Sequence, residues 1–203
     1  MIILICGFSA SGKSYLVNSV AKKLKYKHVH TSDILNQFAS GVPENKIQIE
    51  NTKMNTGWYE FSGLDKKRDK SMALDNKLDK FLIKLVNTKG NLVLDSWTLP
   101  YLIKNNPKII KIWLDATKIE RAKRLSLRDK ISYKEAQKIL KEKDNFSKTH
   151  FQKLYGFTLG KDKKVFDLVI NTNNLSIKQV ENKTMAFLKK KIKVKWFFFL
   201  VFL

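Results

Sequence analysis

Eight residues near the start of the chain have the types and the spacing of a phosphate-binding loop. Residues 7–14 read GFSASGKS and fit the pattern Gly-x-x-x-x-Gly-Lys-Ser/Thr. A loop that wraps a triphosphate places backbone N–H groups on anionic oxygens, so Gly7 and Gly12 keep side chains away. Lys13 can reach the outer phosphates, and the Ser14 hydroxyl is a hard oxygen ligand suited to Mg²⁺. The predicted ATP-binding residues are Gly7, Phe8, Ser9, Ala10, Ser11, Gly12, Lys13, Ser14 and Tyr15.

The segments on either side of this loop are those that the pattern requires. Residues 2–6 form an apolar run, which predicts a buried strand that ends directly at Gly7. Apolar residues after Ser14 recur at the spacing of one helical face, which predicts a helix whose N-terminal dipole points at the phosphates. The alternative is a glycine-containing turn with no ligand. The order strand, loop, helix favours the phosphate-binding interpretation.

Asp33 follows a second predicted strand, which covers residues 27–31. Open α/β sheets bind ligands at the carboxyl ends of their strands, so Asp33 is a candidate for contact with a substrate. The alternative is that Asp33 only charges the start of a helix. Thr31 or Ser32 is predicted to cap that helix through its hydroxyl group.

A third predicted strand, residues 91–95, reads NLVLD and ends in Asp95. An aspartate at the end of an apolar strand commonly holds or orients Mg²⁺ in proteins with such a loop. Asp95 is therefore predicted to share the metal with Ser14. Ser96 and Trp97 follow Asp95 into the same crevice, and they are predicted to bind the acceptor substrate together with Asp95.

Three arginines lie on one face of a predicted helix that begins at a capping box, residues 117–120. The spacing of Arg121, Arg124 and Arg128 places them on the same side of the helix. A guanidinium offers a rigid fork that matches phosphate, and lysine cannot reproduce it. The alternative is a solvated face paired with acidic neighbours such as Asp129 or the glutamate of the capping box.

A second capping box at residues 132–135 opens another basic helix, one short turn after the arginine helix. Two capped, cation-rich helices joined by a short turn are predicted to form a lid over residues 128–156. Such a lid excludes water from phosphoryl transfer and completes the charge clamp. The predicted lid residues are Arg121, Lys143, Lys148 and His150.

Predicted strands and helices alternate along the whole chain. The strands cover residues 2–6, 27–31, 91–95, 109–114 and 167–171. Alternation of this kind indicates an α/β fold with a parallel sheet covered on both faces. Together with the loop, it predicts a three-layer α/β/α P-loop NTPase fold with a five-stranded parallel sheet and a helical lid.

The chain is predicted to form a single domain over residues 1–195. Residues 41–66 are its least regular part and are expected to be a mobile insertion on the acceptor side. Their aromatic residues 58–61 are expected either to stack on a base or to pin the insertion to the body. Residues 196–203 form an apolar tail, far shorter than the roughly 20 residues that span a bilayer. This tail is interpreted as an extension without a selected role; an extra strand or weak membrane-surface contact are the alternatives.

The formal net charge of +22 over 203 residues suits anionic partners. Only four of the 40 basic residues are arginines, however, and the lysines are scattered without an interleaved basic and aromatic stripe. Nucleic acid is therefore not expected as a partner. The lone Cys6 cannot form an internal disulfide, and the chain opens directly into a strand without a leader sequence. Both features predict a cytoplasmic protein.

With these motifs placed, the chain resembles the archaeal-type cytidylate kinase family, which are small nucleoside monophosphate kinases of the P-loop class. The resemblance covers about residues 1–188. It rests on the motifs GFSASGKS, LDNKLDK before GNLVLDS, IWLDATKIERAKRLSLRD, SYKEAQKILKEKDNFSKTHFQKLYG and FDLVINT, in this order.

The resemblance implies transfer of the ATP γ-phosphoryl group to CMP or dCMP with Mg²⁺. It implies that residues 7–14 hold ATP, that Lys13, Arg124 and Arg128 are catalytic, and that Asp33 faces the acceptor nucleotide. No covalent intermediate is expected, because such enzymes work by positioning and charge neutralisation.

The chain departs from the family pattern on the acceptor side. Asn36 stands where the family typically has an arginine, and Ser96 and Trp97 stand where many members have glycine and arginine. Several lid positions usually held by arginine are lysine or histidine here, which keeps charge but loses the bidentate fork.

Two classes of function follow from the sequence. The first is a monomeric phosphotransferase acting on a pyrimidine nucleoside monophosphate, or on another nucleotide, a nucleoside or a metabolite. The second is a non-catalytic nucleotide-binding protein associated with a membrane or RNA. The arginine face favours the enzyme, because a pure binder has no evident need for a clamp on transition-state charge.

Overall fold

The computed structural model describes residues 1–50, 52, 72–103 and 106–201, with residues 193–201 described through their backbone alone. Within these ranges the strands are β1 (Ile2–Cys6), β2 (Lys27–His30), β3 (Leu92–Asp95), β4 (Ile109–Asp115) and β5 (Leu168–Asn171). They form one parallel sheet in the order β2-β3-β1-β4-β5. Ile5 pairs with Asp95 on one side and with Ile112 on the other, so the carboxyl ends of three central strands meet. The predicted five-stranded parallel sheet is confirmed.

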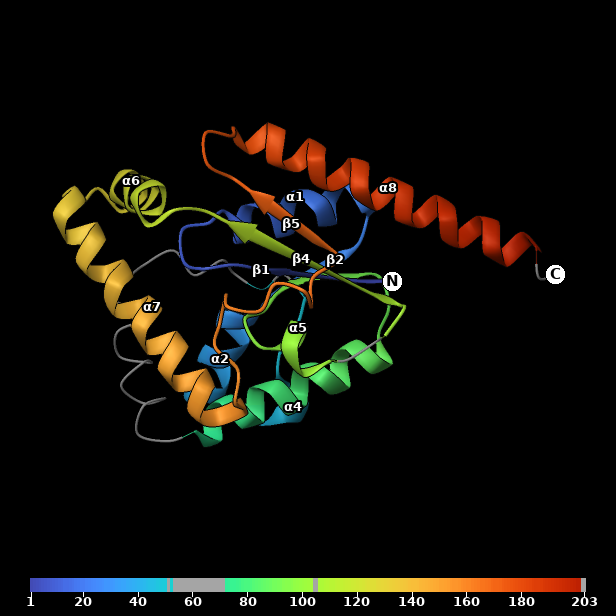
Figure 1. Ribbon diagram of the computed structural model, residues 1–203. Coiled ribbons are helices and arrows are strands. Elements are labelled where there is room, and N and C mark those ends of the chain that lie inside the picture. Colours follow the sequence, from blue (N-terminus) through green and yellow to red (C-terminus); the bar gives the residue numbers. More distant parts are fainter. Residues whose placement is uncertain (51, 53–71, 104–105, 202–203) are drawn as a thin grey trace.

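Helices cover both faces of this sheet (Figure 1). One face carries α1 (Lys13–Leu24) and α8 (Ile177–Val201), and the other carries α2 (Thr31–Ala39), α4 (Ala73–Thr88) and α5 (Leu99–Leu102). Alternate residues of β1 point to the two faces: Ile3 and Ile5 pack under α1, and Ile2 and Leu4 pack with α2 and α4. The three-layer α/β/α architecture is therefore as predicted.

Two helices form a hairpin beyond the carboxyl end of the sheet, α6 (Lys118–Asp129) and α7 (Tyr133–Tyr155). Both predicted capping boxes are present. The Thr117 hydroxyl accepts from the Glu120 N–H, and the Ser132 hydroxyl accepts from the Glu135 N–H, each at 3.2 Å. The helices are held together by a small apolar cluster that contains Leu125 of α6. The hairpin stands over the end of the sheet where the phosphate loop lies.

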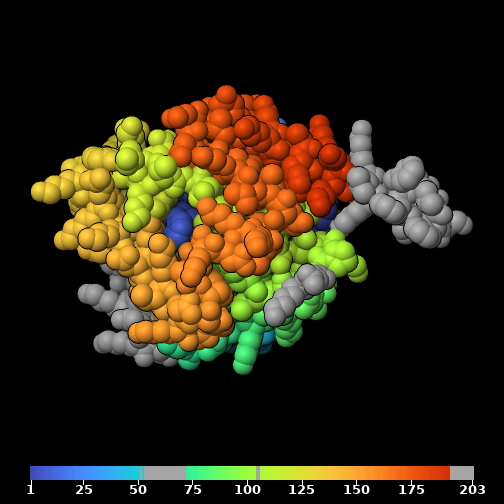
Figure 2. Space-filling view, in the orientation of Figure 1, coloured from blue at the N-terminus to red at the C-terminus, as the bar shows by residue number. Residues whose placement is uncertain are grey.

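The surface is hollowed at this end of the sheet. Figure 2 shows blue atoms of the N-terminal part of the chain at the bottom of an opening. The yellow-green atoms of α6 and the orange atoms of the chain from α7 onward frame it. The segment that contains the phosphate loop can therefore be reached from this side.

The C-terminal tail and the predicted insertion differ in how the predictions for them compare with the structure. Residues 196–201 continue α8 as helix, so the alternative of an extra strand is wrong. In the predicted insertion, residues 44–46 form the short 3₁₀ helix η1 (Glu44–Lys46), and the aromatic residues 58–61 lie outside the described residues. None of the helices in the described part of the chain combines the length and the apolar character that a bilayer crossing requires.

Glu181 fastens α8 to α1. Its carboxylate accepts a hydrogen bond from Ser19 and forms ion pairs with Lys23 at 2.5 Å and Lys178 at 3.2 Å. The hydrogen bonds from Lys23 and Ser19 lower the pKa of Glu181 from 4.5 to about 2. The folded protein therefore favours the ionised form of this carboxyl group.

The stability that Glu181 contributes is expected to depend on pH. Because its pKa is depressed by folding, the contribution is present above pH 4.5 and is lost as the pH falls towards 2. We expect a Glu181→Gln variant to unfold about 2–4 °C below the wild type at pH 7, and at nearly the same temperature near pH 2. Thermal unfolding from pH 2 to pH 7 tests this, and a pH-independent difference would contradict it.

Candidate active site

The phosphate loop between β1 and α1 needs its two glycines for different reasons. Gly7 adopts φ 148°, and a Cβ atom there would stand 2.5 Å from the carbonyl oxygen of Leu114. Gly12 adopts φ 100° just before α1, and no atom of the described residues lies within 4 Å of the place that its Cβ would take. Its requirement is therefore conformational alone. Gly7, in contrast, serves both the backbone conformation and the close approach to β4.

The Lys13 ammonium is folded back onto the loop. Its Nζ donates to the carbonyl oxygen of Phe8 at 3.0 Å and lies 5.6 Å from the centre of the Trp97 ring. Desolvation lowers the pKa of this partly buried lysine, and the nearby Asp95 carboxylate acts in the opposite direction. The cation is thus held inside the loop by contacts that a phosphate oxygen could replace.

Asp95 ends β3 and caps α2. Its Oδ1 accepts from the Thr31 N–H at 2.8 Å, and its Oδ2 lies 3.4 Å from Nδ1 of His30. Burial acts to raise the pKa of Asp95, but the contacts with His30, Thr31 and Lys13 outweigh it, so the pKa is lowered. The N-cap residue of α2 is His30, and its side chain makes no capping hydrogen bond to the helix. The cap is therefore supplied by a neighbouring strand, and the predicted cap by Thr31 or Ser32 is wrong.

Ser14 and Asp95 line the same cavity and provide the donor set that Mg²⁺ prefers. A hydroxyl and an ionised carboxylate are hard oxygen donors, and Mg²⁺ usually takes one or two protein groups besides phosphate and water. Among the residues that the structure describes, no three His, Cys, Asp or Glu side chains are grouped to hold a metal alone. The residues present therefore fit a Mg²⁺ ion that arrives with a nucleotide.

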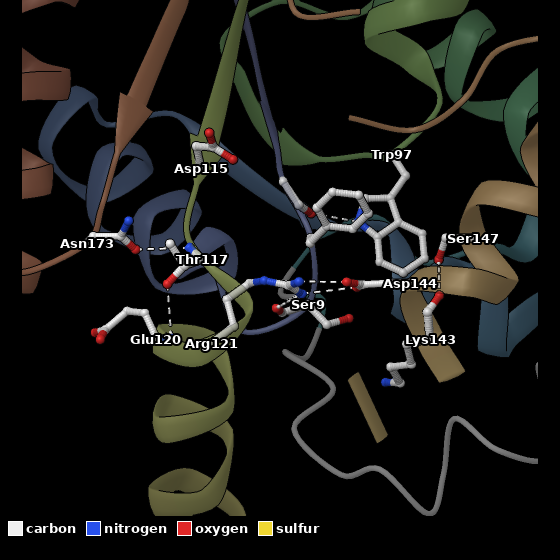
Figure 3. Close-up of polar contacts among 12 residues, drawn as sticks. Ser9, Trp97, Asp115, Thr117, Glu120, Arg121, Lys143, Asp144, Ser147 and Asn173 are labelled. Carbon is white, nitrogen blue, oxygen red and sulfur yellow. Dashed lines mark hydrogen bonds and ion pairs between the residues drawn. The ribbon is translucent and has the colours of Figure 1, made fainter. Parts of the chain in front are cut away.

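Trp97 and Ser96 line the cavity, and their hydrogen bonds are made to the protein. The indole N–H of Trp97 donates to the carbonyl oxygen of Gly7 at 2.8 Å (Figure 3). The Ser96 hydroxyl accepts from the Leu99 N–H at 3.1 Å and so begins α5. Their predicted contact with the acceptor stays a prediction.

Arg121 ties the phosphate loop to α7 (Figure 3). Its side chain is buried, and its two terminal nitrogens donate to the Asp144 carboxylate at 3.0 and 2.6 Å. One of them also donates to the carbonyl oxygen of Ser9 at 3.2 Å, and the guanidinium lies 5.1 Å from the Phe8 ring. Arg121 thus holds the shape of the loop from outside the cavity.

The other two arginines of α6 have different surroundings. Arg124 donates to the carbonyl oxygen of Thr172 at 2.7 Å and pairs with Glu120 at 3.1 Å. Arg128 pairs with Asp129 at 2.6 Å, is 45% exposed, and lines the cavity, whereas Arg121 and Arg124 do not. All three arginines therefore pair with an acidic residue, as in the alternative considered above, but Arg121 is buried and is not part of a solvated face.

The predicted lid residues of α7 also divide into different environments. Lys143 lines the cavity, and the Lys148 ammonium lies 5.4 Å from the centre of the Phe8 ring. His150 is buried, and its Nε2 lies 2.9 Å from a carboxylate oxygen of Asp75 on α4. His150 therefore attaches α7 to the body of the protein and is not among the residues that line the cavity.

Asp75 and Asp79 of α4 are cavity residues to which the sequence analysis assigned no role, although both lie in the motif LDNKLDK. Both are buried, on the same face of the helix as Leu78. Asp79 accepts hydrogen bonds from the hydroxyl groups of Thr98 and Tyr155, each at 2.5 Å. The signal in the sequence that could have revealed these two residues is their spacing of three and four residues, which places two carboxylates among the apolar positions of α4.

One cavity joins the phosphate loop to α2 and α4. Its wall includes Ser9, Lys13 and Ser14 from the loop region and Thr31 and Ser32 from α2. Asp33, the predicted acceptor contact, is not part of this wall, and its carboxylate accepts from the Gln37 side chain at 3.3 Å. The cavity wall thus contains four of the nine predicted ATP-binding residues, namely Ser9, Ala10, Lys13 and Ser14, and it does not contain Asp33.

The fold and the site together define a P-loop kinase. They combine a parallel sheet with a phosphate loop after its first strand, a helical hairpin over that loop, and one cavity lined by cations and hard oxygen donors. The sequence model of the Cytidylate kinase-like family matches residues 2–174, and the chain belongs to this family. It is therefore a nucleoside monophosphate kinase. The family resemblance noted in the sequence is confirmed.

Individual relatives agree with this assignment. The cytidylate kinase of Sulfurisphaera tokodaii is 29% identical over 188 residues, which cover 93% of this chain and 95% of that protein. An uncharacterized protein from Eubacterium ventriosum has a similar structure, with a TM-score of 0.68, 15% identity, and coverage of 93% and 98%. A shikimate kinase from Bacteroides thetaiotaomicron follows with a TM-score of 0.54, 13% identity, and coverage of 93% and 96%. At these identities the two structures support the fold alone.

Proposed function

We propose that the enzyme transfers the γ-phosphoryl group of ATP to CMP or dCMP in the presence of Mg²⁺. The observation that carries the proposal is the single cavity lined by both the phosphate loop and the residues of α2 and α4, in a member of the Cytidylate kinase-like family. Phosphoryl transfer between two nucleotides requires donor and acceptor to lie in line within one site. A shared cavity meets this requirement.

On the donor side, the backbone N–H groups of residues 8–14 and the N-terminus of α1 bind the triphosphate. Lys13 exchanges its contact with the carbonyl oxygen of Phe8 for one with the outer phosphates. Ser14 and Asp95 would hold Mg²⁺, which neutralises charge on the β- and γ-phosphate oxygens when it is bound.

On the transferring group, Arg128 and Lys143 neutralise the charge that spreads over the phosphoryl oxygens, since both line the cavity. Arg124 lies next to the loop, with one guanidinium nitrogen 3.5 Å from the carbonyl oxygen of Ser11. It joins the clamp if it releases Thr172. A phosphate oxygen of the acceptor is the nucleophile, so the protein forms no covalent intermediate.

On the acceptor side, α4 places the carboxylates of Asp75 and Asp79 in the cavity wall. Carboxylates accept hydrogen bonds from the exocyclic amine of cytosine, and uracil carries an oxygen at that position. This chemistry supports a cytosine nucleotide as the acceptor. A different small acceptor is the second candidate, because Asn36 stands where the family typically has an arginine.

An ADP-release assay with ATP and Mg²⁺ tests the proposal against a panel of acceptors. The panel holds CMP, dCMP, UMP, AMP, GMP, nucleosides and shikimate. We expect turnover on CMP and dCMP, with UMP slower by about 10-fold or more, because a mismatched polar group would face the carboxylates of α4. Turnover confined to another acceptor would keep the mechanism and overturn the substrate. Silence across the panel, with ATP still bound, would contradict the proposed function.

A further inference from the structure

The indole N–H of Trp97 is engaged by the phosphate loop. It donates to the carbonyl oxygen of Gly7 at 2.8 Å, and Gly7 in turn lies against the backbone of Leu114. An indole has a single N–H donor and no acceptor, so the group that binds Gly7 cannot also recognise a substrate base. Trp97 thus fixes the first residue of the loop from the segment that follows β3.

The ring of Trp97 lies next to the charged residue of the same loop. The Lys13 ammonium is 5.6 Å from the ring centre, within the range in which an aromatic ring attracts a cation. The ring also makes an edge-to-face contact with Phe151 of α7, at 6.0 Å between centroids. Trp97 therefore contacts the phosphate loop near both of its ends, at Gly7 and at Lys13, and connects them with α7 through Phe151.

We infer that Trp97 is a positioning residue for ATP. It acts through the Gly7 carbonyl and the Lys13 ammonium, and it sets the loop conformation that receives the triphosphate. The sequence alone suggested contact with the acceptor, whereas the hydrogen bond to Gly7 assigns Trp97 to the donor side. The inference rests on the proposed function only in taking ATP as the donor.

Two substitutions at this position separate the two contacts. Trp97→Phe keeps an aromatic face near Lys13 and removes the N–H, and Trp97→Leu removes both. We expect the Kd for ATP with Mg²⁺, measured by calorimetry without acceptor, to rise about 5-fold for Trp97→Phe and about 30-fold for Trp97→Leu. The KM for ATP should rise in parallel, while the KM for CMP stays within about twofold.

Trp113→Phe is the matched control. Trp113 lies in the same aromatic cluster and makes an edge-to-face contact with the Phe8 ring, which phenylalanine would keep, while its indole N–H donates to Asp115 at 3.4 Å and not to Gly7. The control removes an indole N–H from this cluster without touching Gly7. We therefore expect its Kd for ATP to equal that of the wild type, and circular dichroism to show that all three variants are folded.

The outcomes distinguish this inference from the proposed function. A higher KM for CMP with an unchanged Kd for ATP would assign Trp97 to the acceptor and overturn the inference. Unchanged constants for both nucleotides, or equal losses in Trp97→Phe and Trp113→Phe, would overturn it as well. Weaker ATP binding in the Trp97 variants of an enzyme that shows no turnover on CMP would support the inference and contradict the proposed acceptor.

Discussion

Replacement of Lys13 by alanine is expected to lower kcat by about 10²-fold or more and to leave the protein folded. Lys13 is the cation that the loop holds within reach of the outer phosphates, and its Nζ donates to the carbonyl oxygen of Phe8 within the loop itself. Loss of a positioned charge that stabilises the transferring group costs about 10²- to 10⁴-fold in kcat. The ADP-release assay at saturating ATP and CMP measures this loss.

Lys163→Ala is the control for the Lys13 variant. Lys163 pairs with Asp115 at 2.7 Å near the same end of the sheet, but it does not line the cavity. The control variant therefore loses a lysine of similar setting without losing a phosphate contact, and its kcat should equal that of the wild type. Full activity of Lys13→Ala, with thermal unfolding unchanged, would contradict the assignment of this cavity as the active site.

Replacement of Asp144 by alanine is expected to cause the largest loss of stability among single substitutions in the hairpin. The change would leave the Arg121 guanidinium buried without its bidentate partner. Breaking a buried ion pair from one side costs about 3–5 kcal/mol, which lowers the unfolding temperature by about 6–20 °C in a chain of this size. Urea and thermal unfolding would both register the change.

Two further variants separate an unpaired buried charge from the loss of any ion pair. Asp129→Ala breaks the more exposed pair with Arg128 and should cost less than about 1 kcal/mol. A double variant, Arg121→Met with Asp144→Leu, removes both charges and should recover most of the stability that Asp144→Ala loses. Equal destabilisation of the double and the single variant would show that stability is lost with the ion pair itself, and not because an unpaired charge remains buried.

Most of the fold could be predicted because its signals are local. The apolar run Ile2–Cys6 is a strand with the predicted bounds, and the capping boxes at residues 117–120 and 132–135 begin α6 and α7 as expected. The cap of α2 could not be predicted in this way. Its acceptor is Asp95, which lies 64 residues from Thr31 in the sequence and reaches it only through the pairing of β2 with β3.

The site could be predicted as far as its chemistry depends on one contiguous motif. The phosphate loop has the expected neighbours, but the partners of Arg121 and His150 lie 23 and 75 residues away in the sequence. Helix periodicity places the three arginines of α6 on one side, yet it does not say which neighbours they meet. Tertiary packing decides that only Arg128 of the three lines the cavity.

Helix α7 is attached to α4 near its C-terminal end, so a tilt of α7 would pivot about that end. His150 and Tyr155 bind Asp75 and Asp79 in the last two turns of α7. The helix has 23 residues, which corresponds to a length of about 35 Å. A tilt of about 10° around the attached end would move the far end by about 6 Å and Lys143 by about 3 Å. A tilt of that size would therefore move Lys143 relative to the cavity by about the length of one hydrogen bond.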